Sequence, residues 1–211
     1  MASALSDQHA RLIEKIQNPQ AKILFLGYSE KQTSLIEDLV NSCCEVWHTE
    51  DRIASTAGYD VVVSYGYRHI LTKPVIESSD APIVNLHISY LPWNRGAHPN
   101  FWSFYDCTPS GVSIHLIDEG IDTGPILYQR YVNFSKNERT FSQTYRRLIV
   151  EIEQLFKENI ADIVTKNFLP VPQRREGTFH RIADLPKEFS GWDADIRTEV
   201  VRLDDILPGT N

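Results

Sequence analysis

Short apolar segments alternate with helix-like segments through the first half of the chain. The apolar segments are rich in β-branched and aromatic residues, which predicts strands over residues 22–27, 44–48, 59–65 and 83–87. Between them, the patterns over 31–42 and 73–78 predict helices. Strands that alternate with helices at this spacing are typical of an α/β fold with a doubly wound, mostly parallel sheet and helices on both faces.

The second half of the chain has a different pattern. Two further strands are predicted over 111–116 and 126–134, separated by an acidic loop that contains glycine. Apolar residues then recur at three- and four-residue steps, which predicts one long helix through Phe141, Tyr145, Leu148, Ile152, Leu155, Phe156, Ile160 and Ile163.

Proline and arginine interrupt this helical pattern after Phe168. We therefore expect one domain over residues 1–168, which begins with a helix over 5–17, and an irregular tail over 169–211. Within the tail, the segment 196–203 is predicted to form a short helix.

Charge and cysteine content narrow the function classes. The chain has 21 basic and 28 acidic residues, a net charge of −7, which disfavours binding driven by the phosphates of a nucleic acid. Its three cysteines form neither a zinc-binding pattern nor a disulfide framework. No segment approaches the roughly 20 apolar residues of a membrane span. We expect a cytoplasmic protein that binds no metal, no nucleic acid and no membrane.

Candidate catalytic residues lie at the end of one predicted strand and in the acidic loop. Asn85 and His87 are two residues apart, so their side chains lie on the same side of the strand over 83–87. Together with Asp122 they offer an amide donor for an oxyanion, a proton acceptor and an orienting carboxylate. This set indicates acyl-group chemistry without a covalent nucleophile. The structural alternative is an ordinary loop with a packed histidine and a turn aspartate.

Other polar clusters give weaker indications. His98, His115 and Asp118 could be grouped with His87 as metal ligands, but their spacing is not that of a zinc site and His115 can pack within its strand. Three arginines, Arg139, Arg146 and Arg147, are interpreted as a solvated helix face, with phosphate binding as the less favoured reading.

Three motifs resemble the signature of formyltransferases that use 10-formyltetrahydrofolate. They are the stretch from Asn85 to Pro92 and on to Gly96, the strand from Gly111 to His115, and the loop from Gly120 to Pro125. The resemblance implies a Rossmann-like formyltransferase fold, with Asn85, His87 and Asp122 as the catalytic residues. It also implies that the pterin of the folate co-substrate binds to His69, Ile70, Leu71, Ile117, Asp118, Glu119, Gly120 and Ile121.

Within the family, the segment from Leu91 to Ser103 is most similar to enzymes that formylate nucleotide-linked 3- or 4-amino deoxysugars for surface glycans. The resemblance implies that the acceptor contacts Asn94, Arg95, His98, Asn100 and Trp102. Rigidity and packing of the loop are the structural alternative for these five residues. Methionyl-tRNA formyltransferases carry a further carboxy-terminal barrel, and the length and acidity of this chain disfavour them.

Two other activities remain alternatives at this point. A glycinamide ribonucleotide transformylase needs a phosphate-binding loop after its first strand, where this chain has Glu30 in place of a suitable anion site. A formyltetrahydrofolate hydrolase would use water in place of the amine. A silent folate- or nucleotide-binding protein is disfavoured by the intact Asn-His-Asp set. Aromatic residues in the tail, Phe179, Phe189 and Trp192, favour a homodimer.

Overall fold

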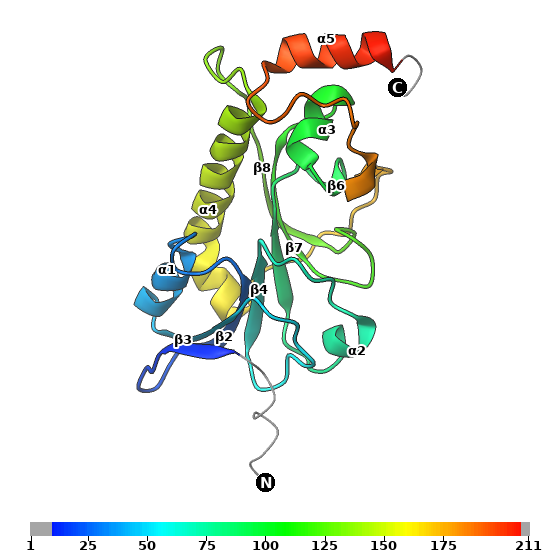
Figure 1. Ribbon diagram of the computed structural model, residues 1–211. Helices are drawn as coiled ribbons and strands as arrows, with labels where there is room; N and C mark the ends of the chain where they lie inside the picture. Colours follow the sequence, from blue (N-terminus) through cyan, green and yellow to red (C-terminus); the bar gives the residue numbers. More distant parts are fainter. Residues whose placement is uncertain (1–9, 208–211) are drawn as a thin grey trace.

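The computed structural model describes residues 10–207. Its main sheet has seven strands in the order β1-β3-β2-β4-β5-β7-β8 (Figure 1). In chain order these strands are β1 (Arg11–Glu14), β2 (Ala21–Gly27), β3 (Cys44–Thr49), β4 (Val61–Tyr65), β5 (Ile83–His87), β7 (Gly111–Leu116) and β8 (Ile126–Tyr131). A second, two-stranded sheet pairs β6 (Arg95–Gly96) with β9 (Phe179–His180).

Helices lie on both faces of the main sheet. They are α1 (Leu35–Asn41), α2 (Lys73–Ile76), α3 (Pro99–Tyr105), α4 (Phe141–Thr165) and α5 (Ile196–Ile206), with a short 3₁₀ helix at Ile182–Asp184. Helices α1 and α4 lie on one face and α2 on the other. The six predicted strands and the long helix are confirmed, with ends that differ by a few residues. The predicted helix over 31–42 begins only at Leu35.

The centre of the main sheet is parallel, as the apolar runs predict. Strands β3, β2, β4 and β5 pair in parallel, and every residue of β4 is buried. The antiparallel strands β7 and β8 then extend the sheet beyond β5. This arrangement places the end of β5 between parallel and antiparallel neighbours, and that edge of the sheet carries the polar residues of the candidate site.

The predicted amino-terminal helix is wrong over its described part. Arg11–Glu14 form β1, which pairs antiparallel with β3, whereas residues 1–9 lie outside the described residues. Leu12 and Ile13 have the spacing of a helix face, but pairing with an exposed sheet edge satisfies their backbone groups instead. A segment this short takes the structure that its tertiary neighbour imposes.

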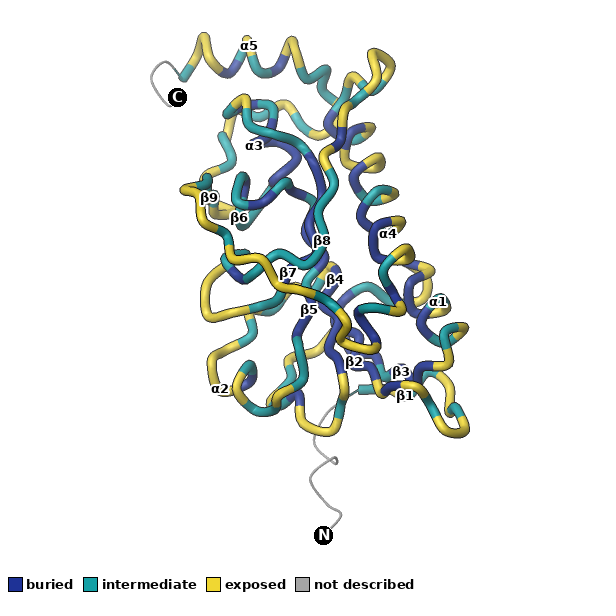
Figure 2. Tube along the Cα trace, turned by 180° about the vertical axis from the view of Figure 1, so that it is seen from behind, coloured by how far each residue is buried: buried dark blue, intermediate teal, exposed yellow. Residues whose placement is uncertain are grey.

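The two faces of the main sheet are covered differently. Helices α1 and α4 pack on one face, where Phe25, Leu39 and Phe156 are fully buried. Loops and the four-residue helix α2 cover the other face around Leu24 and Val62. Figure 2 shows the resulting band of buried residues through the strands, with exposed residues on the outer side of α4.

Helix α4 begins with a capping box. The Thr140 side chain accepts a hydrogen bond from the Gln143 backbone, and the Gln143 side chain accepts one from the Thr140 backbone. This reciprocal pair satisfies backbone donors at the helix start. Residues that face the candidate site from the first turns of α4 are thereby held in a fixed position.

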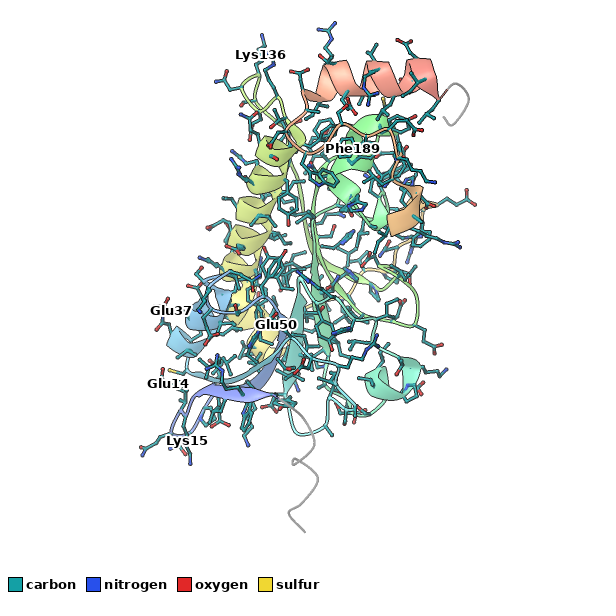
Figure 3. All side chains as sticks on the ribbon, in the orientation of Figure 1. Glu14, Lys15, Glu37, Glu50, Lys136 and Phe189 are labelled. Carbon is teal, nitrogen blue, oxygen red and sulfur yellow. The ribbon has the colours of Figure 1, made fainter. Side chains whose placement is uncertain are left out.

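A smaller apolar core joins α3 to the tail. Phe101 is fully buried, and its ring lies within 5.5 Å of the rings of Phe141 and Phe189. Figure 3 places Phe189 between α3 and α5. The tail therefore packs on the domain, and Phe189 is only partly exposed, whereas Phe179 and Trp192 are 44% and 41% exposed. The homodimer stays a prediction. The short helix predicted near 196–203 is confirmed as α5.

Among the described residues, no helix has the length and apolar character needed to cross a membrane.

Candidate active site

Three polar side chains meet at the carboxyl end of β5. Asn85 and His87 belong to β5, and Asp122 lies in the loop between β7 and β8. The Asn85 Nδ2 atom lies 3.4 Å from Asp122 Oδ1, and His87 Nε2 lies 3.6 Å from Asp122 Oδ2. The structure thus brings together the three residues that the sequence singled out as catalytic candidates.

A fourth residue of this cluster is His115, which the sequence interpretation assigned to packing or to a weak metal set. Its Nε2 lies 3.1 Å from Asn85 Nδ2 and 3.4 Å from Asp122 Oδ1. The antiparallel pairing of β5 with β7 places His115 directly opposite Asn85. Only the strand order gives this neighbour, so a reading of single strands could not find it.

The partners of His115 define its neutral form. Its Nδ1 lies 2.8 Å from the Leu116 carbonyl oxygen, which can only accept a hydrogen bond. The proton of neutral His115 is therefore assigned to Nδ1, and Nε2 accepts from the Asn85 amide. This contact fixes the orientation of the Asn85 amide, because its nitrogen and not its oxygen must face His115 Nε2.

Asp122 is held as a buried anion. Its side chain is 13% exposed, and its Oδ2 accepts a hydrogen bond of 2.8 Å from the Gly96 backbone. Burial raises the pKa of Asp122, but the charge of His87, the protonated form of His115, which donates from Nε2 to the carboxylate, and the hydrogen bond from Gly96 outweigh it, so the pKa lies well below its ordinary value. Asp122 is therefore a carboxylate at neutral pH.

This depressed pKa predicts an acid-dependent stability difference between the wild type and the Asp122→Asn variant. As the pH falls, the unfolded chain takes up the Asp122 proton before the folded one does. The extra stability from the carboxylate is therefore complete above the unfolded pKa and is lost below about pH 4. Urea unfolding at several pH values between 7 and 3 measures it. A free-energy difference that stays constant down to pH 3 would contradict the assignment.

Three cavities lie in a row along this edge of the sheet, and we name them the loop, central and helix cavities. Their volumes are about 200, 280 and 420 Å³. Asn85 and Asp122 line both the loop cavity and the central cavity. Ile88, Pro99 and Tyr145 line both the central cavity and the helix cavity. The polar cluster thus lies where the first two cavities meet.

All the residues that the resemblance assigned to the pterin line the loop cavity. They are His69, Ile70, Leu71, Ile117, Asp118, Glu119, Gly120 and Ile121. Two of its apolar side chains, Ile70 and Ile121, are 73% and 44% exposed. A flat ligand in this cavity would cover apolar surface that now faces water.

The residues predicted to contact the acceptor separate into two groups. His98 and Asn100 line the helix cavity. Asn94 and Trp102 line none of the three cavities. Asn94 is fully buried and bonded to Thr108 and Thr178, and the Trp102 ring stacks on His180 at a centroid distance of 3.7 Å. These contacts hold the loop, and an acceptor contact of Asn94 or Trp102 stays a prediction.

Arg95 also points away from the cavities described here. Its guanidinium donates two hydrogen bonds to Gln173 Oε1, at 3.0 and 3.3 Å from Nη2 and Nε. Arg95 was predicted to contact the acceptor, whereas in the structure its partner is Gln173 of the tail. The first turns of α4 supply a different cation, Arg146, which lines the helix cavity.

Within residues 10–207, no group of three His, Cys, Asp or Glu side chains is arranged to hold a metal ion. The cluster around Asp122 is thus described by its hydrogen bonds and ion pairs alone.

The comparison with known families identifies the class of protein to which this fold and site belong. The family model described as "Formyl transferase" matches residues 17–160, and the chain belongs to this family. Formyltransferases are enzymes, and the six strands of the main sheet other than β1, from β2 to β8, with the polar cluster at the end of β5, lie within the matched residues.

Individual relatives differ in how much of their length is matched. The formyltransferase PseJ from Anoxybacillus kamchatkensis, solved with UDP-4,6-dideoxy-4-formamido-L-AltNAc and tetrahydrofolate, is 38% identical with a TM-score of 0.77. That match covers 83% of this chain and 96% of PseJ. A sugar N-formyltransferase from a Shewanella species shares the fold at 20% identity and a TM-score of 0.68, over 86% of this chain and 87% of that one.

Curated sequences give a second kind of relative. Methionyl-tRNA formyltransferase from Myxococcus xanthus is 35% identical over 119 residues, which are 56% of this chain and 38% of that protein. The chain spans less than half the length of the curated relatives that it matches most strongly.

Proposed function

We propose that this protein transfers a formyl group from 10-formyltetrahydrofolate to the amino group of a nucleotide-linked 3- or 4-amino deoxysugar. The row of three cavities, with Asn85 and Asp122 at the junction of the first two, carries the proposal. The folate lies in the loop cavity, the amino sugar in the central cavity and the nucleotide in the helix cavity. The likeness to PseJ, which was solved with a UDP-linked formamido sugar, supports this class of acceptor.

The chemical character of the loop-cavity lining matches that of a pterin. It offers the exposed side chains of Ile70 and Ile121 to an apolar face, and the backbone of the loop 117–122 to polar ring edges. When bound there, 10-formyltetrahydrofolate supplies an activated formyl carbon. Asn85 and Asp122 line the same cavity, so the formyl group is placed beside them.

The residues of the polar cluster have different roles in the proposed reaction. One Asn85 N–H donates to His115, and the other, which contacts Asp122 Oδ1 at 3.4 Å, turns to the formyl oxygen as negative charge develops on it. One such donor contributes about 3 kcal/mol in comparable acyl transfers. Asp122 is a poor proton acceptor because its pKa lies well below the ordinary value. His87 therefore accepts the proton of the attacking amine, and the Asp122 carboxylate, 3.6 Å from His87 Nε2, stabilises the resulting imidazolium.

The central cavity suits a sugar ring. Tyr28, Tyr65 and Tyr145 line it, and the hydroxyls of Tyr28 and Tyr145 lie 3.4 Å apart. Tyrosine combines an apolar ring with a polar end, which matches a deoxysugar that carries both C–H faces and hydroxyls. The sugar amine would thus reach the cluster at Asp122 from this side.

The helix cavity suits the nucleotide. Arg146 is exposed there and forms no ion pair with any residue that the structure describes. Trp192, 41% exposed, offers a ring face for a base, and Asn100 Oδ1 is buried without a hydrogen-bond partner among the described residues. A diphosphate at Arg146, a base against Trp192 and a hydrogen bond from the nucleotide to Asn100 Oδ1 use all three features.

The phosphate-loop alternative has less support from the structure. The loop after β2 places Glu30 in an ion pair with Arg11 at 2.7 Å, and the side-chain hydrogen bond from Arg11 lowers the pKa of Glu30. A fixed carboxylate repels a phosphate at this position. Glycinamide ribonucleotide therefore enters the test as a competing acceptor.

A direct assay tests the proposed function. Wild-type protein is incubated with 10-formyltetrahydrofolate and one acceptor at a time, and the absorbance change of the folate is followed. The first acceptor is the UDP-linked 4-amino sugar that corresponds to the PseJ ligand; a dTDP-linked 3-amino sugar and glycinamide ribonucleotide follow. Transfer only to an amino sugar is expected. Transfer only to glycinamide ribonucleotide, or formate release without an amine, would overturn the proposal in favour of the transformylase or the hydrolase.

Arg146→Ala is expected to weaken acceptor binding specifically. Loss of a charge-assisted contact of about 1.5–3 kcal/mol raises the KM for the nucleotide-linked sugar by about 10- to 100-fold. The KM for 10-formyltetrahydrofolate stays within two-fold, because Arg146 does not line the loop cavity.

Arg147→Ala is the matched control for this prediction. Arg147 is the next residue of α4 but pairs with Glu151 at 2.7 Å and lines none of the three cavities. An equal rise in KM for both variants would place the nucleotide elsewhere.

A further inference from the structure

The chain after α4 returns across the sheet toward the candidate site. Figure 2 shows this exposed segment crossing the edge strands and reaching β9 beside β6. Val171 forms a β-bridge with Ile126, and Phe179–His180 pair with Arg95–Gly96. The segment lies outside the residues 17–160 that match the family model.

We infer that residues 171–180 form a clasp in which Gln173 is a positioning residue for two loops: the loop that carries Asp122, and the 94–97 loop, which contacts both Asp122 and His87. This inference rests on the proposed formyl transfer for its catalytic consequence, but the contacts that define the clasp do not depend on which acceptor is used. Gln173 lines none of the three cavities and would touch neither substrate.

Gln173 joins one loop to the other through a single side-chain amide. Its Nε2 donates to the carbonyl oxygens of Asp122 and Gly124, at 2.9 and 2.8 Å. Its Oε1 accepts both hydrogen bonds from the Arg95 guanidinium. The two donors and the acceptor oxygen of the amide are thus all used, and glutamate or methionine cannot reproduce this pattern.

Thr178 holds the other end of the clasp. Its Oγ1 accepts from the Asn94 backbone at 2.8 Å, and its carbonyl oxygen accepts from the Arg95 backbone at 3.0 Å. The His180 carbonyl oxygen accepts from Ala97 at 2.8 Å. The backbone N–H groups of Asn94, Arg95 and Ala97 therefore all donate to the clasp.

The held loop contacts both reacting side chains. The Gly96 N–H donates to Asp122 Oδ2, and the Asn94 carbonyl oxygen lies 3.2 Å from His87 Nε2. A shift of the 94–97 loop relative to Asp122 would change both contacts together. Because Gln173 bonds to Arg95 on one side and to the Asp122 backbone on the other, it fixes this relative position.

The local backbone needs such support. Asp122 has φ of 54°, in the left-handed region that L-residues seldom occupy. The clasp also lies too close to the 94–97 loop for a side chain, since a Cβ at Gly96 would meet the His180 carbonyl oxygen at 2.3 Å. The clasp contacts therefore restrict the backbone conformations that these loops could otherwise adopt.

Two variants of Gln173 test the clasp. Gln173→Met keeps the length of the side chain and removes its hydrogen bonds, and Gln173→Glu keeps an acceptor for Arg95 and removes both donors. Each is expected to lower kcat by about 10- to 100-fold, the range of a small misplacement of reacting groups. The KM values for folate and acceptor stay within two-fold, because Gln173 touches neither cavity. Gln154→Met, on the exposed face of α4, is the matched control and keeps wild-type kcat.

Amide hydrogen exchange supplies a readout that does not need activity. In both Gln173 variants the Gly96 amide is expected to exchange at least ten-fold faster, whereas the Ala97 amide, bonded to His180, changes little. Unchanged Gly96 exchange, or a kcat within three-fold of wild type, overturns the clasp. If wild-type protein transfers formyl to no acceptor, the proposed function fails, and the Gly96 exchange alone decides on the clasp.

Discussion

Replacing Asp122 by Asn is expected to lower the formyl-transfer kcat by about 10³-fold, within the range for loss of acid–base assistance. Asn keeps the shape of the side chain and an oxygen that can accept from Gly96, so the fold is retained. It removes the negative charge that lies 3.6 Å from His87 and 3.4 Å from His115. Steady-state kinetics with saturating folate and acceptor measure the effect.

The Asp122→Asn variant should still bind tetrahydrofolate. Most of the loop cavity is formed by other residues of the 67–71 and 117–121 segments, so the dissociation constant is expected to change less than five-fold. Asp162→Asn, near the end of α4 and away from the cavities, is the control and keeps full activity. Near-normal turnover in Asp122→Asn would remove the carboxylate from the mechanism.

His87→Ala is the second change with a large expected effect, again a fall of about 10³-fold in kcat. The imidazole is nearly buried, and its Nε2 lies between the Asn94 carbonyl oxygen and the Asp122 carboxylate. Among the described residues that line the central cavity, His87 alone has an imidazole, and this imidazole contacts Asp122. The variant therefore loses the group that accepts the amine proton.

His115→Ala provides the comparison for His87→Ala. His115 contacts Asn85 and Asp122 but does not line the central cavity, where the amine is placed. Its loss acts through the orientation of Asn85, so a smaller fall of about 10- to 30-fold in kcat is expected, below the roughly 10²- to 10³-fold effect of removing an oxyanion donor itself. If the two variants fall equally, the proton transfer cannot be assigned to His87 alone.

The sequence predicted the main elements of the fold because their signals are local. The apolar runs at β2, β4 and β5 are long enough, and the period of α4 is regular enough, for the backbone structure to follow from composition and spacing. The short elements were different. β1 depends on its pairing with β3, and α3 lies where a loop was predicted, held by the ring cluster around Phe101. Their own sequences are too short to decide their structure.

The candidate site was predicted in part for a similar reason. Asn85 and His87 are separated by one residue on a strand, so strand geometry alone places them on one side. Asn94 and Trp102 looked equally suited to a ligand, since a polar or aromatic loop residue has the same appearance whether it is buried or exposed. Their burial is decided by Thr178 and His180, which lie more than seventy residues further along the chain.

By itself, the sequence determined the parallel α/β fold, the Asn85 and His87 pair and the acidic loop with Asp122, because each depends on neighbours within a few residues. The tertiary structure alone decided that His115 joins the cluster, that Arg146 reaches a cavity and that Gln173 ties two loops together. These three facts depend on strand order and on contacts between distant segments. Side-chain hydrogen bonds act only over about 3 Å, so the folded path of the chain, which local patterns do not specify, selects their partners.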